Sequence, residues 1–269
     1  MQKQNISLIL GLVLSGVILL LMLSSFVWTP HDPLAQDATN RLAAPSGTHP
    51  FGTDNLGRDI LSRILVGTGT TLLVALGTVL IGTLGGIIVG SLTGYFGGWL
   101  DELFMRLSDA LTAFPTMLLA LVVISLIGSG TANVIWVLGI LFIPSFARVL
   151  RGEFARCRNL DYVKRAKLMG ASSARVMFRH ILPNAMPVFL STVAIGFNNA
   201  VLAEAGMSFL GIGVQMPDIS LGRILDDSHG YLVLAPWWAL LSGAMIALIV
   251  LGFSLLSDGL QRRGRKLNA

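Results

Sequence analysis

The sequence predicts an all-α integral membrane protein with six transmembrane helices and both termini in the cytoplasm. Three observations support this fold class. Hydrophobic residues make up 54% of the 269 residues and charged residues only 12%, about half of the charged share in a soluble domain. Six apolar stretches are long enough to cross a bilayer, and Lys and Arg gather on one side of the resulting topology.

Each of the six stretches reaches about 20 residues, the length that a helix needs to cross the hydrocarbon core. The first follows Lys3 and could pass for a signal peptide. It is longer than the apolar core of a signal peptide and no A-x-A cleavage site follows, so we interpret it as a retained helix. The predicted helices are 6–28, 70–95, 102–127, 131–150, 186–212 and 235–257.

The positions of Lys and Arg give the orientation. Most of the 19 lie in segment 148–179 and in the C-terminal tail, and such clusters mark cytoplasmic segments. The net charge of +5 therefore needs no nucleic acid to explain it. The predicted organisation is the N-terminus and first helix (1–28), an external loop (29–69), a transmembrane domain (70–257) containing the cytoplasmic segment 151–185, and a basic cytoplasmic tail (258–269).

The external loop 29–69 is rich in Pro, Asp, Thr and Gly, which is typical of turns. Its stretch "RDILSRIL", residues 58–65, places apolar residues on one helical face and polar residues largely on the other. This pattern predicts a short helix lying in the outer membrane interface. The alternative is an ordinary polar loop with one helical turn.

Glycine recurs at every fourth position of the second predicted helix, at Gly82, Gly86, Gly90 and Gly94. This spacing stacks the glycines along one helix face, where another backbone can approach closely. Packing within the chain and contact with a helix of another subunit both fit the pattern.

Motifs of the common catalytic sites do not occur. The sequence has no G-x-x-x-x-G-K-[ST] phosphate-binding loop, no HExxH and no GxSxG. The single cysteine, Cys157, excludes an intrachain disulfide. The four histidines are scattered, so we expect no metal site. The chain is therefore predicted not to be an enzyme.

Residues 161–184 form a basic island between two apolar helices. The sequence predicts a short helix, a break at Gly170 and a second short helix from about 172 to 181, which ends before Pro183. Tyr162, Ala166 and Met169 make an apolar stripe on the first helix. This element could rest on anionic headgroups or fit a groove on another protein, and residue chemistry alone leaves both readings open.

Several stretches resemble the permease subunits of binding-protein-dependent ABC importers. That family has an E-A-A-x-x-x-G motif followed by a helix ending in Leu-Pro. Lys164 and Arg165 depart from the motif in a way that resembles the dipeptide, oligopeptide and nickel branch, and Leu221 and Ser242 stand where Trp and Pro are common. The matching stretches are "KRAKLMG" (164–170), "HILPN" (180–184), "HPFGTDNLGRDILSRILVG" (49–67), "EAGMSFLGIGVQMP" (204–217) and "APWWALLSGAMI" (235–246).

The resemblance covers most of the chain and points to the second, shorter permease of a pair with the type I importer fold. It implies a bacterial cytoplasmic (inner) membrane protein that pairs with a homologous permease, two ABC ATPases and an external substrate-binding protein. ATP and magnesium would be bound by the ATPases, so no cofactor is expected in this chain. The residues that it implies for ATPase docking are Tyr162, Lys164, Arg165, Ala166, Leu168, Met169 and Gly170.

Polar residues inside a membrane span usually face a cavity or a partner. Asn198, Asn199 and Glu204 lie in the fifth predicted helix and are our candidates for the translocation path, although each could instead bond a neighbouring helix. The family implies di- or oligopeptides as substrate, with nickel or a metal–chelator complex as the alternative. A secondary transporter or channel is the alternative of a different class.

Overall fold

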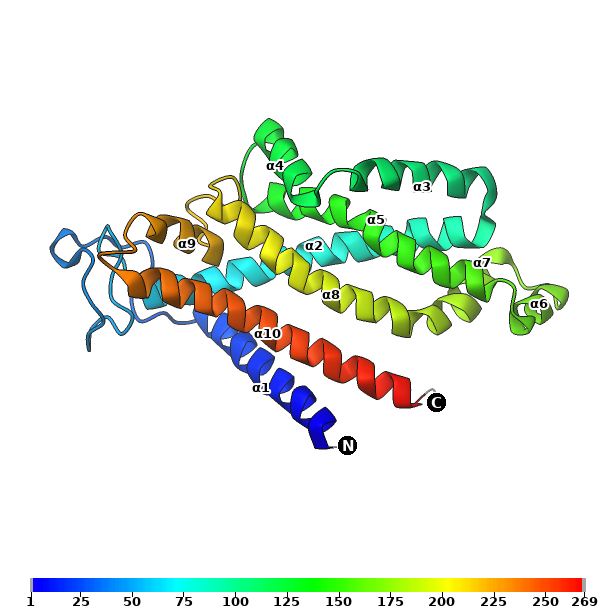
Figure 1. The fold of residues 1–269 in the computed structure, drawn as a ribbon, viewed down its shortest axis with the longest axis horizontal. Helices are drawn as coiled ribbons and strands as arrows, with labels where there is room; N and C mark the ends of the chain where they lie inside the picture. Colours follow the sequence, from blue (N-terminus) through cyan, green and yellow to red (C-terminus); the bar gives the residue numbers. More distant parts are fainter. Residues whose placement is uncertain (1, 268–269) are drawn as a thin grey trace.

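The computed structural model describes residues 2–267, with side chains for residues 8–259. The side chains of Lys3 and of the basic residues Arg262, Arg263, Arg265 and Lys266 lie outside that range. The described chain is built from helices joined by loops (Figure 1). They are α1 (Gln2–Ser25), η1 (Ala38–Asn40), α2 (Ile60–Phe96), α3 (Gly98–Thr112), α4 (Thr116–Ile127), α5 (Thr131–Cys157), α6 (Asp161–Leu168), α7 (Ser173–Arg175), the π-helix η2 (Val176–Ile181), α8 (Leu182–Phe209), α9 (Leu221–His229) and α10 (Pro236–Leu267).

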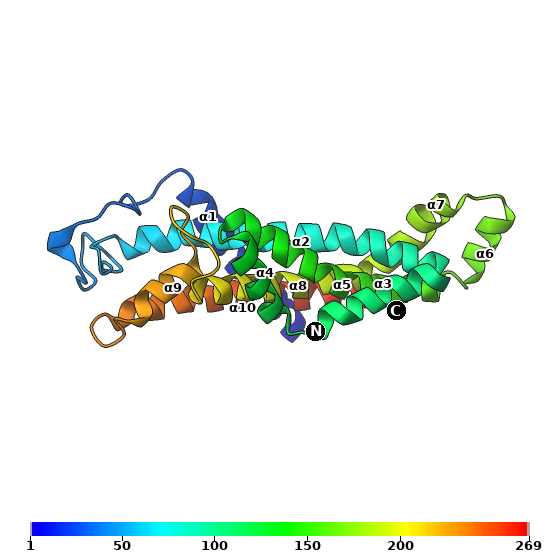
Figure 2. The same cartoon turned by 90° about the horizontal axis from the view of Figure 1, so that it is seen from above.

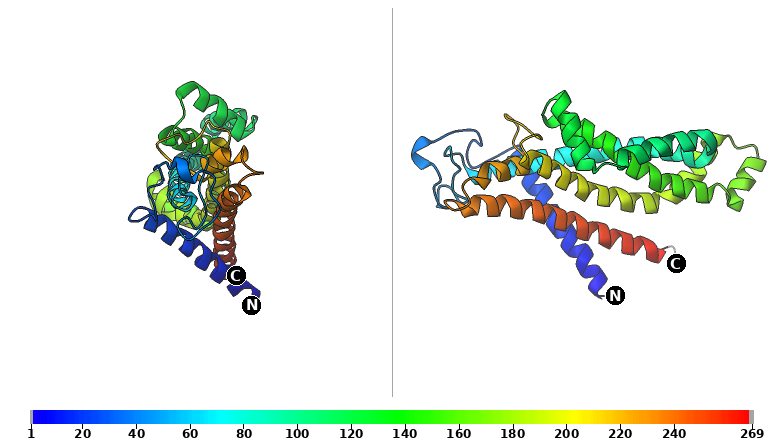
Figure 3. Two further views of the ribbon diagram at one scale, coloured as in Figure 1. Left: turned by 90° about the vertical axis from the view of Figure 1, so that its left-hand side faces the viewer. Right: turned by 45° about the horizontal axis from the view of Figure 1, so that its top comes forward.

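The molecule is elongated, with two different ends (Figures 1 and 2). One end, here called the loop end, carries residues 26–59 and α9. The other, here called the α6 end, carries α6 and α7. The helices α1 and α10 run side by side and project together from the rest of the bundle (Figure 3). The start of α1 and the end of α10 both lie away from the loop end.

Five described helices are long and apolar enough to cross a membrane, and α3 with α4 would make a sixth as one bent span. The single helix predicted over 102–127 is therefore two helices in the structure. The two helices meet at an angle of 86°, and Pro115 stands at the break. Proline has no N–H to donate and disfavours a helical conformation at the preceding residue, here Phe114.

The predicted interfacial helix is also wrong, because residues 60–65 are the first turns of the 37-residue helix α2. Asp59 caps this helix by accepting a hydrogen bond from the Ser62 amide at 2.8 Å. Both faces are buried, including the polar Ser62 and Arg63. The side that the sequence pattern assigned to water faces the loop segment 26–59 and α9, because Arg63 pairs with Asp54 and Asp227 and the Ser62 hydroxyl accepts from the His31 amide.

The glycine stripe of α2 packs against α5 within the chain. An added Cβ at Gly86 would lie 2.5 Å from the Phe146 Cβ, and one at Gly90 would lie 2.6 Å from the Ala147 carbonyl oxygen. Gly82 meets the Phe142 and Phe146 side chains and Gly94 meets the backbone of Arg151 in the same way. The two helices thus pack at a distance that no side chain on these positions would permit.

The sequence predicted that the second short helix of the basic island ends before Pro183, but in the structure it does not. It continues from α7 through η2 into α8. At the end of η2 the Leu182 amide donates to the carbonyl oxygen of Met177, five residues back. Such a wide turn accommodates Pro183, which has no N–H for the regular helical bond.

Candidate functional site

The short helix α6 stands at the tip of the α6 end (Figures 1 and 2). It ends where Gly170 adopts φ +80°, a conformation that favours glycine. The Ala171 amide then donates to the Ala166 carbonyl oxygen at 3.0 Å, which closes the helix C-terminus. The predicted break at Gly170 is therefore present and has a specific backbone geometry.

One face of α6 belongs to the core of the chain. Val163 and Ala166 are buried, and they pack with Phe154 and Cys157 of α5 and with Val176 of η2. Tyr162 is half-buried beside them. Burial raises the pKa of the Tyr162 phenol to about 12, so this side chain is neutral at physiological pH.

The opposite face of α6 is open. Leu168 is 87% exposed and Met169 82%, and Lys164, Arg165 and Lys167 surround them. Lys167 also lies over the ring of Tyr95 from α2, with Nζ 4.8 Å from the ring centroid. Leu168 and Met169 are neighbours in the chain and both exposed, and a contiguous exposed apolar patch is typical of a surface that a partner or a membrane covers.

This geometry divides the predicted docking residues into two groups. Tyr162 and Ala166 hold α6 on its own chain, whereas Lys164, Arg165, Leu168, Met169 and Gly170 are exposed. The stripe Tyr162–Ala166–Met169 is therefore not one accessible surface. Leu168, which the stripe omits, is 87% exposed, slightly more than Met169.

A cavity of about 400 Å³ opens between α4, α5 and α8. Its walls are mostly apolar, with Met117, Phe142 and Phe146 among them, and its polar groups come from Thr116, Ser145, Thr192 and Asn199. This volume and this mixture are typical of a small-molecule binding pocket. Sequence reasoning found Asn199 but missed the other polar groups, because Ser and Thr are common in helices that bind nothing.

The three predicted path residues lie in different surroundings. Asn199 is exposed and lines the cavity, and Asn198 is half-buried and does not. Glu204 is fully buried, and its Oε1 accepts a hydrogen bond from the Ser208 hydroxyl at 2.7 Å. Ser208 in turn accepts from the Val214 amide. Glu204 thus ties α8 to the loop that follows it, and its position gives no support to a role in the path.

The loop end holds a buried ionic cluster that the sequence did not reveal. Asp54 accepts hydrogen bonds from Arg58 and Arg63. Both arginines also reach Asp227 of α9, Arg63 at 2.9 Å and Arg58 at 3.6 Å. The four residues lie in two segments far apart in the sequence, so no local pattern indicates their pairing. The cluster fixes α9 and the loop to the start of α2.

Comparison with known proteins identifies the family. The family described as "Binding-protein-dependent transport system inner membrane component" matches residues 86–265. The dipeptide transport system permease protein DppC of Alkalihalophilus pseudofirmus is 35% identical over 259 residues, which cover 96% of this chain and 85% of that protein. The DppC protein of Haemophilus influenzae is 36% identical over 96% of this chain and 90% of its own length.

A second group of relatives carries a different substrate in its name. The glutathione transport system permease protein GsiD of Pectobacterium atrosepticum is 39% identical over 93% of this chain and 84% of that protein. The predicted resemblance is thus confirmed across nearly the whole chain. The several apolar helices of the chain agree with a multi-pass protein of the inner membrane. The chain belongs to the family of inner-membrane permease components of binding-protein-dependent ABC importers.

Proposed function

We propose that this chain imports short peptides together with a second, homologous permease, and that α6 couples it to cytoplasmic ATPases. The observation that carries the proposal is the two-sided structure of α6. One face is packed into the core of the chain, so a push on α6 moves α5 and α8 with it. The other face presents Leu168 and Met169 within a ring of basic residues, as a helix inserted into a partner's groove does.

The α6 end would face the cytoplasm and the loop end the outside. The basic residues of 158–179 gather at the α6 end, which agrees with the excess of Lys and Arg in cytoplasmic loops. Both termini would then also lie in the cytoplasm. The loop end, with residues 26–59 and α9, would meet the external binding protein.

The energy for transport would come from two ABC ATPases, which would bind ATP and magnesium. The sequence of this chain has no phosphate-binding loop motif. ATP-driven closure of the ATPases would be transmitted through α6. The cavity between α4, α5 and α8 would form this chain's share of the path, completed by the second permease.

The cavity chemistry suits peptides. Hydroxyl and amide groups from Ser145, Thr192 and Asn199 can bond peptide N–H and C=O groups, and the apolar walls can cover side chains. The relatives named for dipeptide and glutathione transport agree with this substrate class. Nickel or a metal–chelator complex is the alternative cargo of the same machine.

Uptake by the complete importer, reconstituted in vesicles, tests the proposal. We expect uptake of a labelled dipeptide or of glutathione that requires ATP, the ATPases and the binding protein. Uptake that continues without ATP and ATPases would instead identify a secondary transporter or channel. Uptake of nickel but of no peptide would contradict the peptide substrate and favour nickel or a metal–chelator complex.

A pair of variants on α8 tests the path. Asn199→Leu removes a polar group from the cavity, and Asn198→Leu makes the same change at the neighbouring position of α8, which does not line the cavity. We expect Asn199→Leu to reduce uptake while ATPase binding is kept, and Asn198→Leu to leave uptake unchanged. Equal uptake by the two variants would remove Asn199 from the path.

A further inference from the structure

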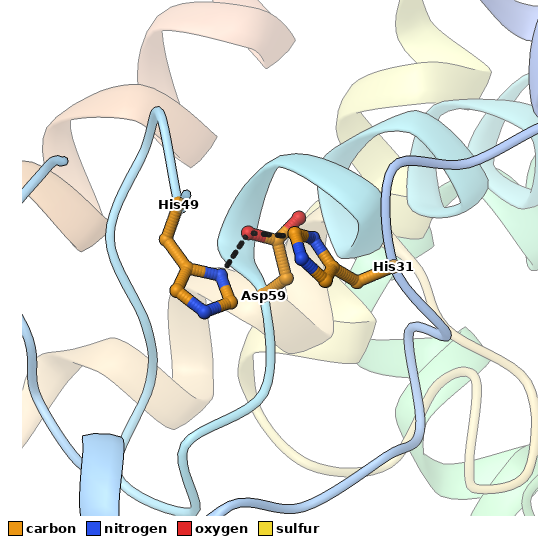
Figure 4. A group of neighbouring side chains, drawn as sticks. All are labelled: His31, His49 and Asp59. Carbon is orange, nitrogen blue, oxygen red and sulfur yellow. Dashed lines mark hydrogen bonds and ion pairs between the residues drawn. The ribbon is translucent and has the colours of Figure 1, made fainter. Parts of the chain in front are cut away.

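Two histidines and a carboxylate converge at the loop end (Figure 4). His31 and His49 come from the loop segment 26–59, and Asp59 is the residue before α2. The His49 Nδ1 lies 2.9 Å from the Asp59 Oδ1, and the His31 Nδ1 lies 3.8 Å from the same oxygen. The two imidazole rings are adjacent, with centroids 4.5 Å apart.

Other groups hold the three side chains in place. The second Asp59 oxygen, Oδ2, accepts from the Ser62 amide at 2.8 Å and from the Ser62 hydroxyl at 2.7 Å. The same hydroxyl accepts from the backbone amide of His31 at 3.0 Å. One serine thus orients the carboxylate and anchors one of the two histidines, as outer-shell partners do around metal ligands.

The charge of Asp59 is compensated differently from that of the other buried carboxylate nearby. Asp54 is bound by two arginines, which are always charged. The Asp59 side chain is 1% exposed, and its ion-pair partners within the described part of the chain are the two histidines, which are charged only when protonated. Its hydrogen bonds with Ser62 and His49 leave the carboxylate without a permanently charged partner within 4 Å among the described residues, and a bound metal ion would supply that charge.

The donor atoms suit a transition metal. Each of the three side chains offers one donor, and these atoms lie within 4.8 Å of one another. In a tetrahedral zinc site the ligand atoms are about 3.3 Å apart, as bonds of about 2.0–2.1 Å require. The His49–Asp59 pair, at 2.9 Å, must therefore open slightly, and the more distant donor atoms, up to 4.8 Å apart, must close around the ion.

We propose that His31, His49 and Asp59 form a binding site for a divalent transition-metal cation of the zinc type. Imidazole nitrogens and one carboxylate oxygen favour such ions over calcium or magnesium. Binding replaces the hydrogen bond between His49 Nδ1 and Asp59 Oδ1, and the proton of that bond is released to water. His31 is 42% exposed, so the remaining coordination position is open to water. The ion links the loop segment, through His31 and His49, to Asp59 at the start of α2.

This site is separate from the cavity and from the transported cargo. None of its three residues lines the cavity between α4, α5 and α8. Sequence reasoning expected no metal site, because the two histidines and Asp59 have no characteristic spacing. Only the fold of the loop brings them together.

Zinc titration of the full-length chain in lipid nanodiscs, purified without a polyhistidine tag and stripped with a chelator, tests the proposal. We expect one zinc ion per chain by isothermal titration and by elemental mass spectrometry. His31→Ala and His49→Ala should each abolish this stoichiometric binding. The control is His229→Ala, on the exposed side of α9, which should bind zinc as the parent chain does.

Ser62→Ala should weaken zinc affinity by about 10–100-fold, because it removes the group that orients Asp59. A measurement on the unaltered chain covers the case in which the variants do not fold. Zinc should protect His31 and His49, but not His229, from modification by diethyl pyrocarbonate. The proposal is overturned if the parent chain binds no zinc, if the variants bind it equally, or if zinc protects neither histidine.

Discussion

The loop end buries a cluster of charged side chains, whereas the α6 end leaves both charged and apolar side chains exposed. At the loop end, Asp54, Arg58 and Arg63 are almost fully buried and pair with one another and with Asp227. At the α6 end, Asp161 and its nearby Lys164 are both more than half exposed. Leu168 and Met169 project beside them without cover. The buried charged groups of the loop end therefore have partners within the chain, whereas the outer face of α6 is left uncovered by the chain.

This difference implies that the loop end determines the stability of the fold, whereas the exposed face of α6 determines binding to a partner. Residues at the loop end have their partners within the chain, so changes there act on folding. Exposed residues of α6 have few contacts to lose, so changes there act on whatever covers them. The following predictions, from the largest effect on stability to the smallest, test this separation.

Asp54→Asn should have the largest effect. The amide keeps the shape of the side chain but leaves Arg58 and Arg63, both nearly inaccessible to water, without the carboxylate between them. Breaking a buried ion pair in this way costs about 3–5 kcal/mol. Denaturant titration of the chain in mixed micelles measures the free energy of unfolding.

The matched control is the same substitution at the other end. Asp161→Asn removes an exposed charge whose partner Lys164 lies 3.8 Å away, and such a pair contributes about 1 kcal/mol or less. Equal losses for Asp54→Asn and Asp161→Asn would contradict the comparison between the two ends.

Gly94→Val tests whether the α6 end is open only on its outer face. An added Cβ at Gly94 would lie 2.6 Å from the Arg151 carbonyl oxygen and from the Phe154 Cβ. Overpacking of this kind costs about 1–3 kcal/mol. Gly152→Ala on α5 is the control, because its Cβ meets nothing within 4 Å and alanine favours a helix. A Gly94→Val chain as stable as the parent would show that α2 and α5 are not tightly packed there.

Protonation of Asp37 should have the smallest effect on stability, and this effect depends on pH. Hydrogen bonds from Thr39 and Asn40 hold the pKa of this carboxylate below its ordinary value of 3.8. Its contribution to the turn is therefore present above the pKa of the unfolded chain and is lost as the pH falls through the lower pKa of the folded turn. Hydrogen exchange of the 37–41 amides, corrected for intrinsic rates, should accelerate there. In Asp37→Asn the added acceleration should be absent.

The sequence predicted the long helices well, because apolar composition over about 20 residues depends little on tertiary contacts. It failed where a tertiary contact reverses a local pattern. The polar face of residues 58–65 indicated water, but the loop and α9 bury it. The bend at Pro115 was missed because composition alone was counted over 102–127, and prolines inside apolar helices are common in membranes.

The candidate site was predicted in part for the same reason. The break at Gly170 is a local property and could be read from the chain. Which face of α6 is covered depends on η2 and α5, so Ala166 was assigned to the partner although it packs inside. The proximity of His31, His49 and Asp59 depends on the path of the loop, which no periodic pattern in the sequence predicts.

The central claim is that the exposed face of α6 binds an ATPase. The direct test is the affinity of the ATPase subunits for importer complexes carrying Leu168→Ala with Met169→Ala, compared with Leu20→Ala with Leu23→Ala, an exposed apolar pair on α1. We predict an unchanged melting temperature for both. ATPase affinity should fall by about 30-fold or more for the α6 pair only, as loss of a binding hot spot worth about 2 kcal/mol implies. Full ATPase binding and transport by the α6 variant would contradict the claim.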